Sequence, residues 1–493
     1  MESIKQTIEI NNKSPEAPKE MGFQSYELLA GDTAERKLQQ EAFLSDNVRN
    51  PELDYPHLDE NDLDQGISNL ESYLEQALQH EDPQAADALY DSASYRLAEM
   101  YWLKEAARLN HLAQTAPDSD EFKLSAKRYQ EANEQLYGTP EKETIEKVYG
   151  EVIAQAQSKN LHPSAQKIYD ELVNGTTVTV AGEEIEVPGI GEDHPDRLPG
   201  DLSERLASLR EFLKEEFKDV FEIVDQYWDE EASLDEDGNK QFTVDDMKAL
   251  FERVHALRDP NNDSGISVVI PSGSSQLAWD TPSTSIRIGE SRAPITSKTD
   301  MVAKIIHEYG VHGLRAVNGQ KSDLDVMKSG MYSDADEGER SDYLTFEEGF
   351  ASLAEMAIDD SFSQWKPLHI SRYLVAASKY QGADFRVAFE QNWRARLLMS
   401  IGDGKEVTET LVNKERKQAH LSTVRLLRGT PTNLTDGPTL TFNKDLAYLS
   451  GKLDGLKYID QAGDDAEAYA WLLKGKFDPN NQRQAELAQR YAA

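Results

Sequence analysis

The chain has 493 residues and a net charge of −38, with 90 acidic against 52 basic side chains. Such a charge repels phosphate backbones and anionic lipid surfaces, so we expect neither a nucleic acid nor a membrane as partner. Because the chain has no cysteine, disulfides and thiol catalysis are excluded, and any zinc site must use His, Asp or Glu.

Composition and periodicity divide the chain into four regions. Residues 1–65 are polar and acidic, and we interpret them as a loosely structured tail or an extension over the surface. Residues 66–160 are predicted to be a helical N-terminal region, 161–465 a catalytic region and 466–493 a C-terminal tail. The first residues lack the apolar core of a signal peptide, and no stretch approaches eighteen apolar residues, so we expect a cytoplasmic protein.

Helical periodicity dominates the first half of the chain. From 66 to about 157, apolar residues recur at spacings of three and four, and the sequence Gly138-Thr139-Pro140 interrupts this pattern. Thr139 is predicted to cap the helix that follows. Further amphipathic helices are expected from 203 to about 228 and from 243 to 257.

Period-two alternation predicts a few short strands. Residues 177–187 have the pattern of a hairpin around a Gly-containing turn. Residues 266–270 and 284–288 are expected in a small mixed sheet. An edge strand beside a binding cleft can pair with an extended peptide backbone, and we assign this role to 284–288, with plain sheet core as the alternative.

The region from 305 to 351 carries the most recognisable chemistry. Glu308 follows His307 directly, His312 lies five residues after the first histidine, and Glu348 follows in a later helix predicted from 344 to 358. Two imidazoles and a later carboxylate, with one position left for water, form the ligand set of a catalytic zinc site. The glutamate next to the first histidine is placed to take a proton from that water.

The spacing of the two histidines requires a distorted helix. In a regular α-helix, residues five apart lie roughly 140° apart around the axis and cannot hold one ion. A one-residue π-bulge would bring the rings into register, and Gly310 would tolerate it. The pair is therefore either a distorted metal-binding helix or a chance occurrence among ten histidines.

Three motifs resemble those of one metallopeptidase family, which includes the microtubule-associated tyrosine carboxypeptidases and bacterial proteins named for a Gln-Glu-Gly-Leu-Ala motif. Residues 307–319 resemble the family's His-Glu-x-Gly-Thr-His-x-x-Arg-x-x-Asn-Gly signature. Residues 347–351, Glu-Glu-Gly-Phe-Ala, resemble the second motif, and residues 442–449 resemble the Phe-Thr-Lys-Asp-x-x-Tyr-Leu segment. The chain departs from the family pattern at Val311, Glu347, Phe350 and Asn443. Glu347 adds a carboxylate, which leaves the third metal ligand ambiguous between Glu347 and Glu348.

The resemblance implies one zinc ion per chain, held by His307, His312 and Glu348, with Glu308 as general base. It also implies a carboxypeptidase that removes a C-terminal residue from a peptide or protein. Such an enzyme needs a cation for the terminal carboxylate, and the candidates in or near the matching segments are Arg315, Arg425, Arg428 and Lys444.

Other residues near the motifs are candidates for supporting roles. Tyr343 or Tyr448 could donate a hydrogen bond to the oxyanion. Glu347 and Asn318 are expected around the metal ligands, and Asp342 and Glu355 are further candidates to orient the histidines. Gly319 is predicted to end the first helix in a left-handed conformation.

We therefore expect a mainly α (α+β) protein: a helical zinc-metallopeptidase catalytic domain with a small mixed β-sheet and a helical N-terminal region. The expected activity is that of a zinc carboxypeptidase. One alternative is a zinc hydrolase of another amide or ester. The other is a non-enzymatic regulatory or binding protein with the same fold, against which the intact Glu308 argues.

Overall fold

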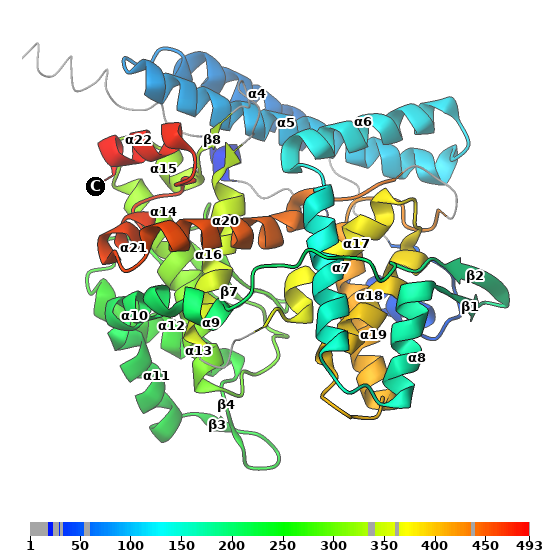
Figure 1. Cartoon of the computed structure of the whole chain (residues 1–493). Helices are drawn as coiled ribbons and strands as arrows, with labels where there is room; N and C mark the ends of the chain where they lie inside the picture. The colour runs from blue at the N-terminus through cyan, green and yellow to red at the C-terminus, as the bar shows by residue number, and fades with distance from the viewer. Residues whose placement is uncertain are drawn as a thin grey trace, which may run out of the picture.

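The computed structural model describes residues 18–22, 29, 33–53, 60–333, 341–359, 364–434 and 439–492. The protein is mainly helical with small mixed sheets, which confirms the predicted fold class (Figure 1). No helix among these residues is long and apolar enough to cross a membrane.

The helices of the N-terminal region lie together along one side of the molecule (Figure 1). They are α4 (Glu60–Ala77), α5 (Pro83–Thr115) and α6 (Asp120–Tyr137). The next helix, α7, spans Lys142–Gln157, and its N-cap is Glu141 rather than the predicted Thr139. Glu141 accepts from the hydroxyl of Thr144 in the first turn, so Glu141 rather than Thr139 makes the local contact at the start of this helix.

Part of the polar N-terminal region packs on the rest of the protein. The helix α3 (Thr33–Leu44) buries Phe43 completely, and its ring makes an edge contact with Phe385 at the start of α18 (Phe385–Ser400). Residues 33–53 are therefore an extension over the surface and not a loose tail. Residues 1–17 lie outside the described part of the chain.

The helix predicted from 203 to 228 is divided into three. These are α9 (Leu202–Arg205), α10 (Ala207–Glu216) and α11 (Lys218–Glu230). The second interruption falls at Phe217, a fully buried residue whose ring packs against Gly310 so closely that a Cβ there would lie 2.8 Å from it. The periodicity continues through both breaks, so it did not reveal them.

The largest described sheet has three strands in the order β5-β7-β6. Strand β7 (Ser285–Ile288) pairs in parallel with β5 (Ser267–Val269) and antiparallel with β6 (Leu277–Asp280). Because both edges of β7 are paired, it cannot receive a substrate strand, and the role assigned to residues 284–288 is wrong. Strand β6, which the alternation pattern did not reveal, is an edge strand that contacts the helix of the two histidines.

Most of the other predicted elements are present. The hairpin is confirmed as β1 (Thr176–Val180) and β2 (Glu183–Val187). The helix predicted from 243 is α12 (Val244–Arg258), which begins with a capping box between Thr243 and Asp246. The remaining elements are η1 (Lys19–Gly22), α8 (Pro163–Asn174), β3 (Ser233–Leu234), β4 (Lys240–Gln241), α15 (Val326–Ser329), β8 (Tyr332–Ser333), β9 (Ser341–Asp342), α17 (Pro367–Tyr380), α19 (Glu409–Leu426), η3 (Asn443–Leu446), α21 (Ala466–Leu472) and α22 (Gln482–Tyr491).

Two long helices cross in backbone contact beside the histidine helix. They are α16 (Tyr343–Ile358), which carries Glu347 and Glu348, and α20 (Ala447–Ala462). A Cβ on Gly349 would lie 1.9 Å from the carbonyl carbon of Gly451, so only glycine fits at this crossing. The contact fixes the separation between Glu348 and the side chains of α20.

We expect Gly349→Ala to lower the free energy of unfolding by about 3 kcal/mol, at the upper end of what overpacking costs in a dense core. The added methyl group meets backbone rather than a movable side chain, so the helices have to separate. Chemical denaturation measures the change. Gly200→Ala is the control, because a Cβ at Gly200 has no heavy atom within 4 Å; equal stability of the two variants would contradict the close crossing.

Candidate metal centre

The two histidines lie on a π-helix. The segment η2 (Ile306–Gly313) is inserted between α13 (Lys298–Ile305) and α14 (Leu314–Gln320), and the three form one continuous helix. In a π-helix, backbone hydrogen bonds join residues five apart, so side chains at that spacing fall on one face. The rings of His307 and His312 accordingly have centroids 4.9 Å apart. The distortion that the spacing required is thus present, and it is longer than the single bulge we predicted.

Each imidazole is held by a carboxylate on α16. The Nδ1 atom of His307 lies 2.6 Å from Glu355 Oε1, and the Nδ1 atom of His312 lies 2.8 Å from Glu347 Oε1. A carboxylate only accepts hydrogen bonds, so each Nδ1 carries the proton and each Nε2 is left as the potential metal donor. This carboxylate–histidine arrangement is the usual support of histidine metal ligands.

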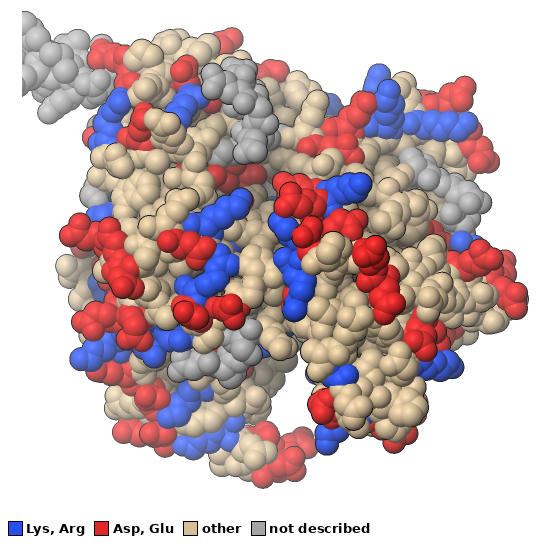
Figure 2. Space-filling view, viewed as in Figure 1, with Lys and Arg blue, Asp and Glu red and all other residues tan. Residues whose placement is uncertain are grey.

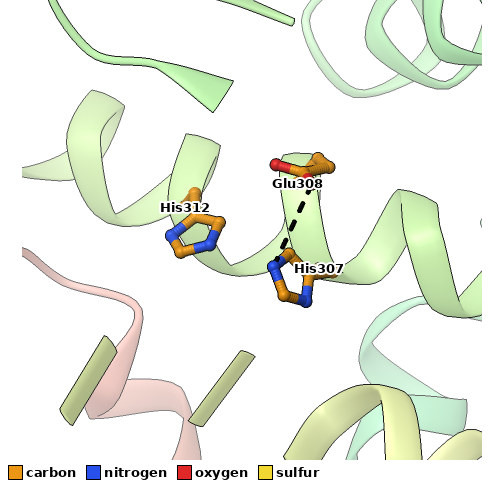
Figure 3. Close-up of side chains that lie close together, drawn as sticks. All are labelled: His307, Glu308 and His312. Carbon is orange, nitrogen blue, oxygen red and sulfur yellow. Dashed lines mark ion pairs between the residues drawn. The ribbon is translucent and has the colours of Figure 1, made fainter. Parts of the chain in front are cut away.

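Glu308 faces the same point as the two rings. Its Oε1 lies 4.0 Å from His307 Nε2, and donor atoms of Glu308 and both histidines all lie within 4.8 Å of one another (Figure 3). The backbone N–H of Trp279 in β6 donates to Glu308 Oε2 at 2.8 Å. The edge strand therefore fixes the orientation of the carboxylate that was predicted to be the general base.

Glu347 is buried in a network of its own. Its Oε1 accepts from Lys476 Nζ at 2.8 Å as well as from His312, and its Oε2 lies 3.1 Å from Arg315 Nη1. Burial alone would raise the pKa of Glu347, but Lys476, Arg315 and His312 hold it well below its usual value. Its Oε1 receives two hydrogen bonds and its Oε2 faces the Arg315 guanidinium without one, and the contact with His312 suits the orienting role.

Two predicted site residues do not take the roles proposed for them. Arg315 is fully buried and donates to the carbonyls of Gly475 and Phe477, so it cannot reach a substrate carboxylate. Asn318 donates to the carbonyl of Leu473 and holds the same C-terminal stretch instead of supporting a metal ligand.

The helix ends at Gln320, one residue past the predicted Gly319, but the left-handed conformation predicted for this glycine is wrong. Gly319 is helical, and a Cβ on it would lie 1.9 Å from the carbonyl oxygen of Met327. The residue is needed for close approach of the backbone and not for a left-handed turn.

Glu348 lies on the correct face of α16 but outside the three-residue group. It is seven residues before Glu355, which places the two carboxylates on one side of the helix two turns apart. Among the described residues, however, the group of three or more such side chains whose donor atoms all lie within 4.8 Å of one another consists of His307, Glu308 and His312, without Glu348. A different side-chain rotamer of Glu348 would be needed for it to join the histidines.

Glu348 lies instead next to a cluster of cations. Its negative charge contributes to the electrostatics of Arg372, Arg425, Lys444 and Lys452, and it helps to raise the pKa of Tyr448. Three of the predicted substrate-binding residues (Arg425, Lys444 and Tyr448) therefore gather on this side of Glu348. The structure adds Arg372 and Lys452, which no motif indicated.

The cluster is organised around Asp445 and the ring of Tyr448. Arg425 Nε and Arg372 Nε lie 2.8 Å and 3.2 Å from the same oxygen of Asp445. Burial opposes the charge of Asp445, but Arg425 and Arg372 lower its pKa to about 2. Lys452 is 2% exposed and donates to the carbonyl of Tyr448, and burial lowers its pKa to about 7.

Tyr343 was predicted as an oxyanion donor and Asp342 as a residue that orients a histidine, and both make contacts elsewhere. Tyr343 is buried with an edge contact to the ring of Tyr332. Asp342 caps α16 by accepting from Thr345 N–H.

Searches of protein-family models, of curated proteins and of solved structures found no match for this chain. The residues themselves fit a zinc ion, because imidazoles whose Nδ1 atoms face carboxylates are typical zinc donors.

Proposed function

We propose that this protein is a zinc-dependent peptidase, and specifically a carboxypeptidase. One observation carries the proposal: two histidines, each with its Nδ1 held by a carboxylate of α16, present Nε2 beside an oriented glutamate. A purely structural zinc site has no use for that glutamate. The motifs that resemble the metallopeptidase family agree with this assignment.

The chemistry follows from the positions of the side chains. A bound zinc ion would polarise the substrate carbonyl and make water more acidic. Glu308 takes a proton from the attacking water and returns it to the leaving amine. The Trp279 N–H holds one Glu308 oxygen, which leaves the other oxygen directed at His307 and the reacting water. Glu348 is the proposed third ligand from the protein.

The cationic cluster supports a carboxypeptidase over an endopeptidase. The guanidinium groups of Arg372 and Arg425 stay charged and share the single carboxylate of Asp445, and Glu348 would give its charge to the metal. A surplus of positive charge at a largely buried site favours an anion. The side chain of Arg425 is 41% exposed, so it is open to a ligand. The free carboxylate of a peptide C-terminus has the required charge and the geometry that arginine binds.

Metal analysis and a peptide screen test this proposal. We expect close to one zinc per chain in the wild type and a loss of bound zinc in His312→Ala. We expect cleavage of peptides with a free C-terminus and none of the same peptides with an amidated C-terminus. A wild type that binds no metal after zinc is added would overturn the proposal. Equal cleavage of amidated peptides would leave a zinc hydrolase without the carboxypeptidase assignment.

Zinc binding is also expected to release a proton from His307. Burial disfavours the charged ring, but the carboxylates of Glu355 and Glu308 outweigh it and raise the pKa of His307 to about 9. Below that pH the metal-free ring is protonated, so zinc affinity should rise about tenfold per pH unit towards pH 9. Calorimetry in buffers of different ionisation enthalpy counts the protons released. Glu355→Gln should release fewer at neutral pH, and an unchanged count would refute the role of this ion pair.

A further inference from the structure

A groove between α10 and α21 lies away from the metal centre. It has a volume of about 740 Å³, and its floor is the half-buried ring of Phe212, which packs 5.5 Å from the buried ring of Tyr469. Ala207, Ala466 and Ala470 complete an apolar lining of small side chains. Since these alanines are exposed, the groove is open to solvent and offers apolar surface to a partner.

All the charged residues that line the groove are acidic, and the polar lining residue Ser208 donates to Asp464. Glu211 and Glu215 lie one turn apart on α10, Glu216 follows them, and Asp464 and Glu467 lie at the start of α21. No basic residue lines the groove, although the chain as a whole has 52 basic to 90 acidic side chains. Figure 2 shows acidic side chains over both helices at the left edge of the molecule. The share of acidic residues among the charged residues is thus higher in the lining of the groove than in the whole chain.

The walls of the groove decide between an extended and a helical occupant. Both walls are helices, whose backbone groups are already paired within each helix, so an extended peptide would find no backbone partners along them. A helix satisfies its own backbone and needs only an apolar face and suitable flanking charges. The ten residues of α10 span about 15 Å, which matches two to three turns of a docked helix.

We propose that this groove binds a basic amphipathic helix of a partner protein. Its apolar side chains, spaced three and four apart, lie on Phe212 and on the exposed Ala466 and Ala470. Its lysines or arginines face Glu215 on one side and the Asp464–Glu467 pair on the other, while Glu211 already lies 3.7 Å from Lys214. This surface is separate from the candidate metal centre, so it does not depend on the proposed peptidase activity.

The test uses fluorescence anisotropy with two labelled peptides of about 14 residues and identical leucine and lysine content. One has its leucines on a single helical face, and the other is a scrambled sequence without that face. We expect the wild-type full-length protein to bind the amphipathic peptide at least about tenfold more tightly than the scrambled one. The scrambled peptide accounts for general attraction to a protein of this net charge.

Three variants locate the binding site. The double variant Glu215→Lys, Glu467→Lys should lose the difference between the peptides, and so should Ala466→Trp, which fills the groove without a change in charge. The double variant Glu184→Lys, Glu186→Lys makes the same change of charge on exposed positions of β2 and should bind like the wild type. Equal binding of both peptides by the wild type, or undiminished discrimination by the two groove variants, would overturn the proposal.

Discussion

Glu308→Gln is expected to lower the rate of peptide cleavage by about 10² to 10⁴-fold while the zinc content stays that of the wild type. Glutamine has the same size, and its amide oxygen can still accept the Trp279 N–H bond, so the local structure should be kept. It cannot take a proton from water at neutral pH. Steady-state kinetics on a peptide that the wild type cleaves, with metal analysis of the same preparation, measure both quantities.

Glu290→Gln, an exposed position outside the site, serves as the matched control and should keep full activity. If Glu308→Gln retained wild-type kinetics with zinc bound, another group would have to act as base. If it lost its zinc, Glu308 would be a ligand, in keeping with its position among the three donor groups.

Lys476→Met is expected to destabilise the protein by about 3–5 kcal/mol and to weaken zinc binding about 10- to 100-fold. The lysine is 2% exposed and donates to both Glu347 and Thr281. Its removal leaves the buried Glu347 carboxylate short of a cation. Because Glu347 orients His312, the loss of the Lys476 ammonium should also weaken the binding of zinc by His312. Chemical denaturation and a zinc competition assay measure the two effects.

The exposed Lys474, two residues earlier, provides the control: Lys474→Met should change the stability by no more than about 0.5 kcal/mol. A double-mutant cycle with Glu347→Gln isolates the interaction, and the two substitutions should be strongly non-additive. Additive effects, or zinc affinity unchanged in Lys476→Met, would contradict the coupling between the C-terminal stretch and His312.

Helix positions were predictable from the sequence wherever the local signals are strong. The capped start of α12 and the turn between β1 and β2 follow from Thr243 and from Ala181-Gly182, which need no knowledge of the tertiary structure. Breaks caused by packing were not predictable in this way. The interruption at Phe217 exists because its ring has to reach Gly310, almost a hundred residues later in the chain.

In the candidate site, too, features set by local sequence were predictable and features set by distant contacts were not. Residues close in sequence, such as His307, Glu308 and His312, could be grouped by their spacing, and the need for a π-helix followed from geometry alone. Lys476, Trp279, Arg372 and Lys452 carry no local pattern, because what places them is a contact between distant segments. Arg315 and Asn318 were misassigned for the converse reason: they lie within a motif, but their partners belong to the C-terminal stretch.

The network around Glu347 has a consequence for the order of folding. The bond from Lys476 to Glu347 spans 129 residues, the one from Arg315 to Gly475 spans 160, and the one from Lys476 to Thr281 spans 195. Contacts of such sequence separation close large loops, whose entropy has to be overcome before the contact gives any stabilisation. His312 therefore reaches its final orientation only after the distant C-terminal stretch has docked. The proposed metal should therefore bind late, to a nearly complete fold. It should not act as a nucleus for folding.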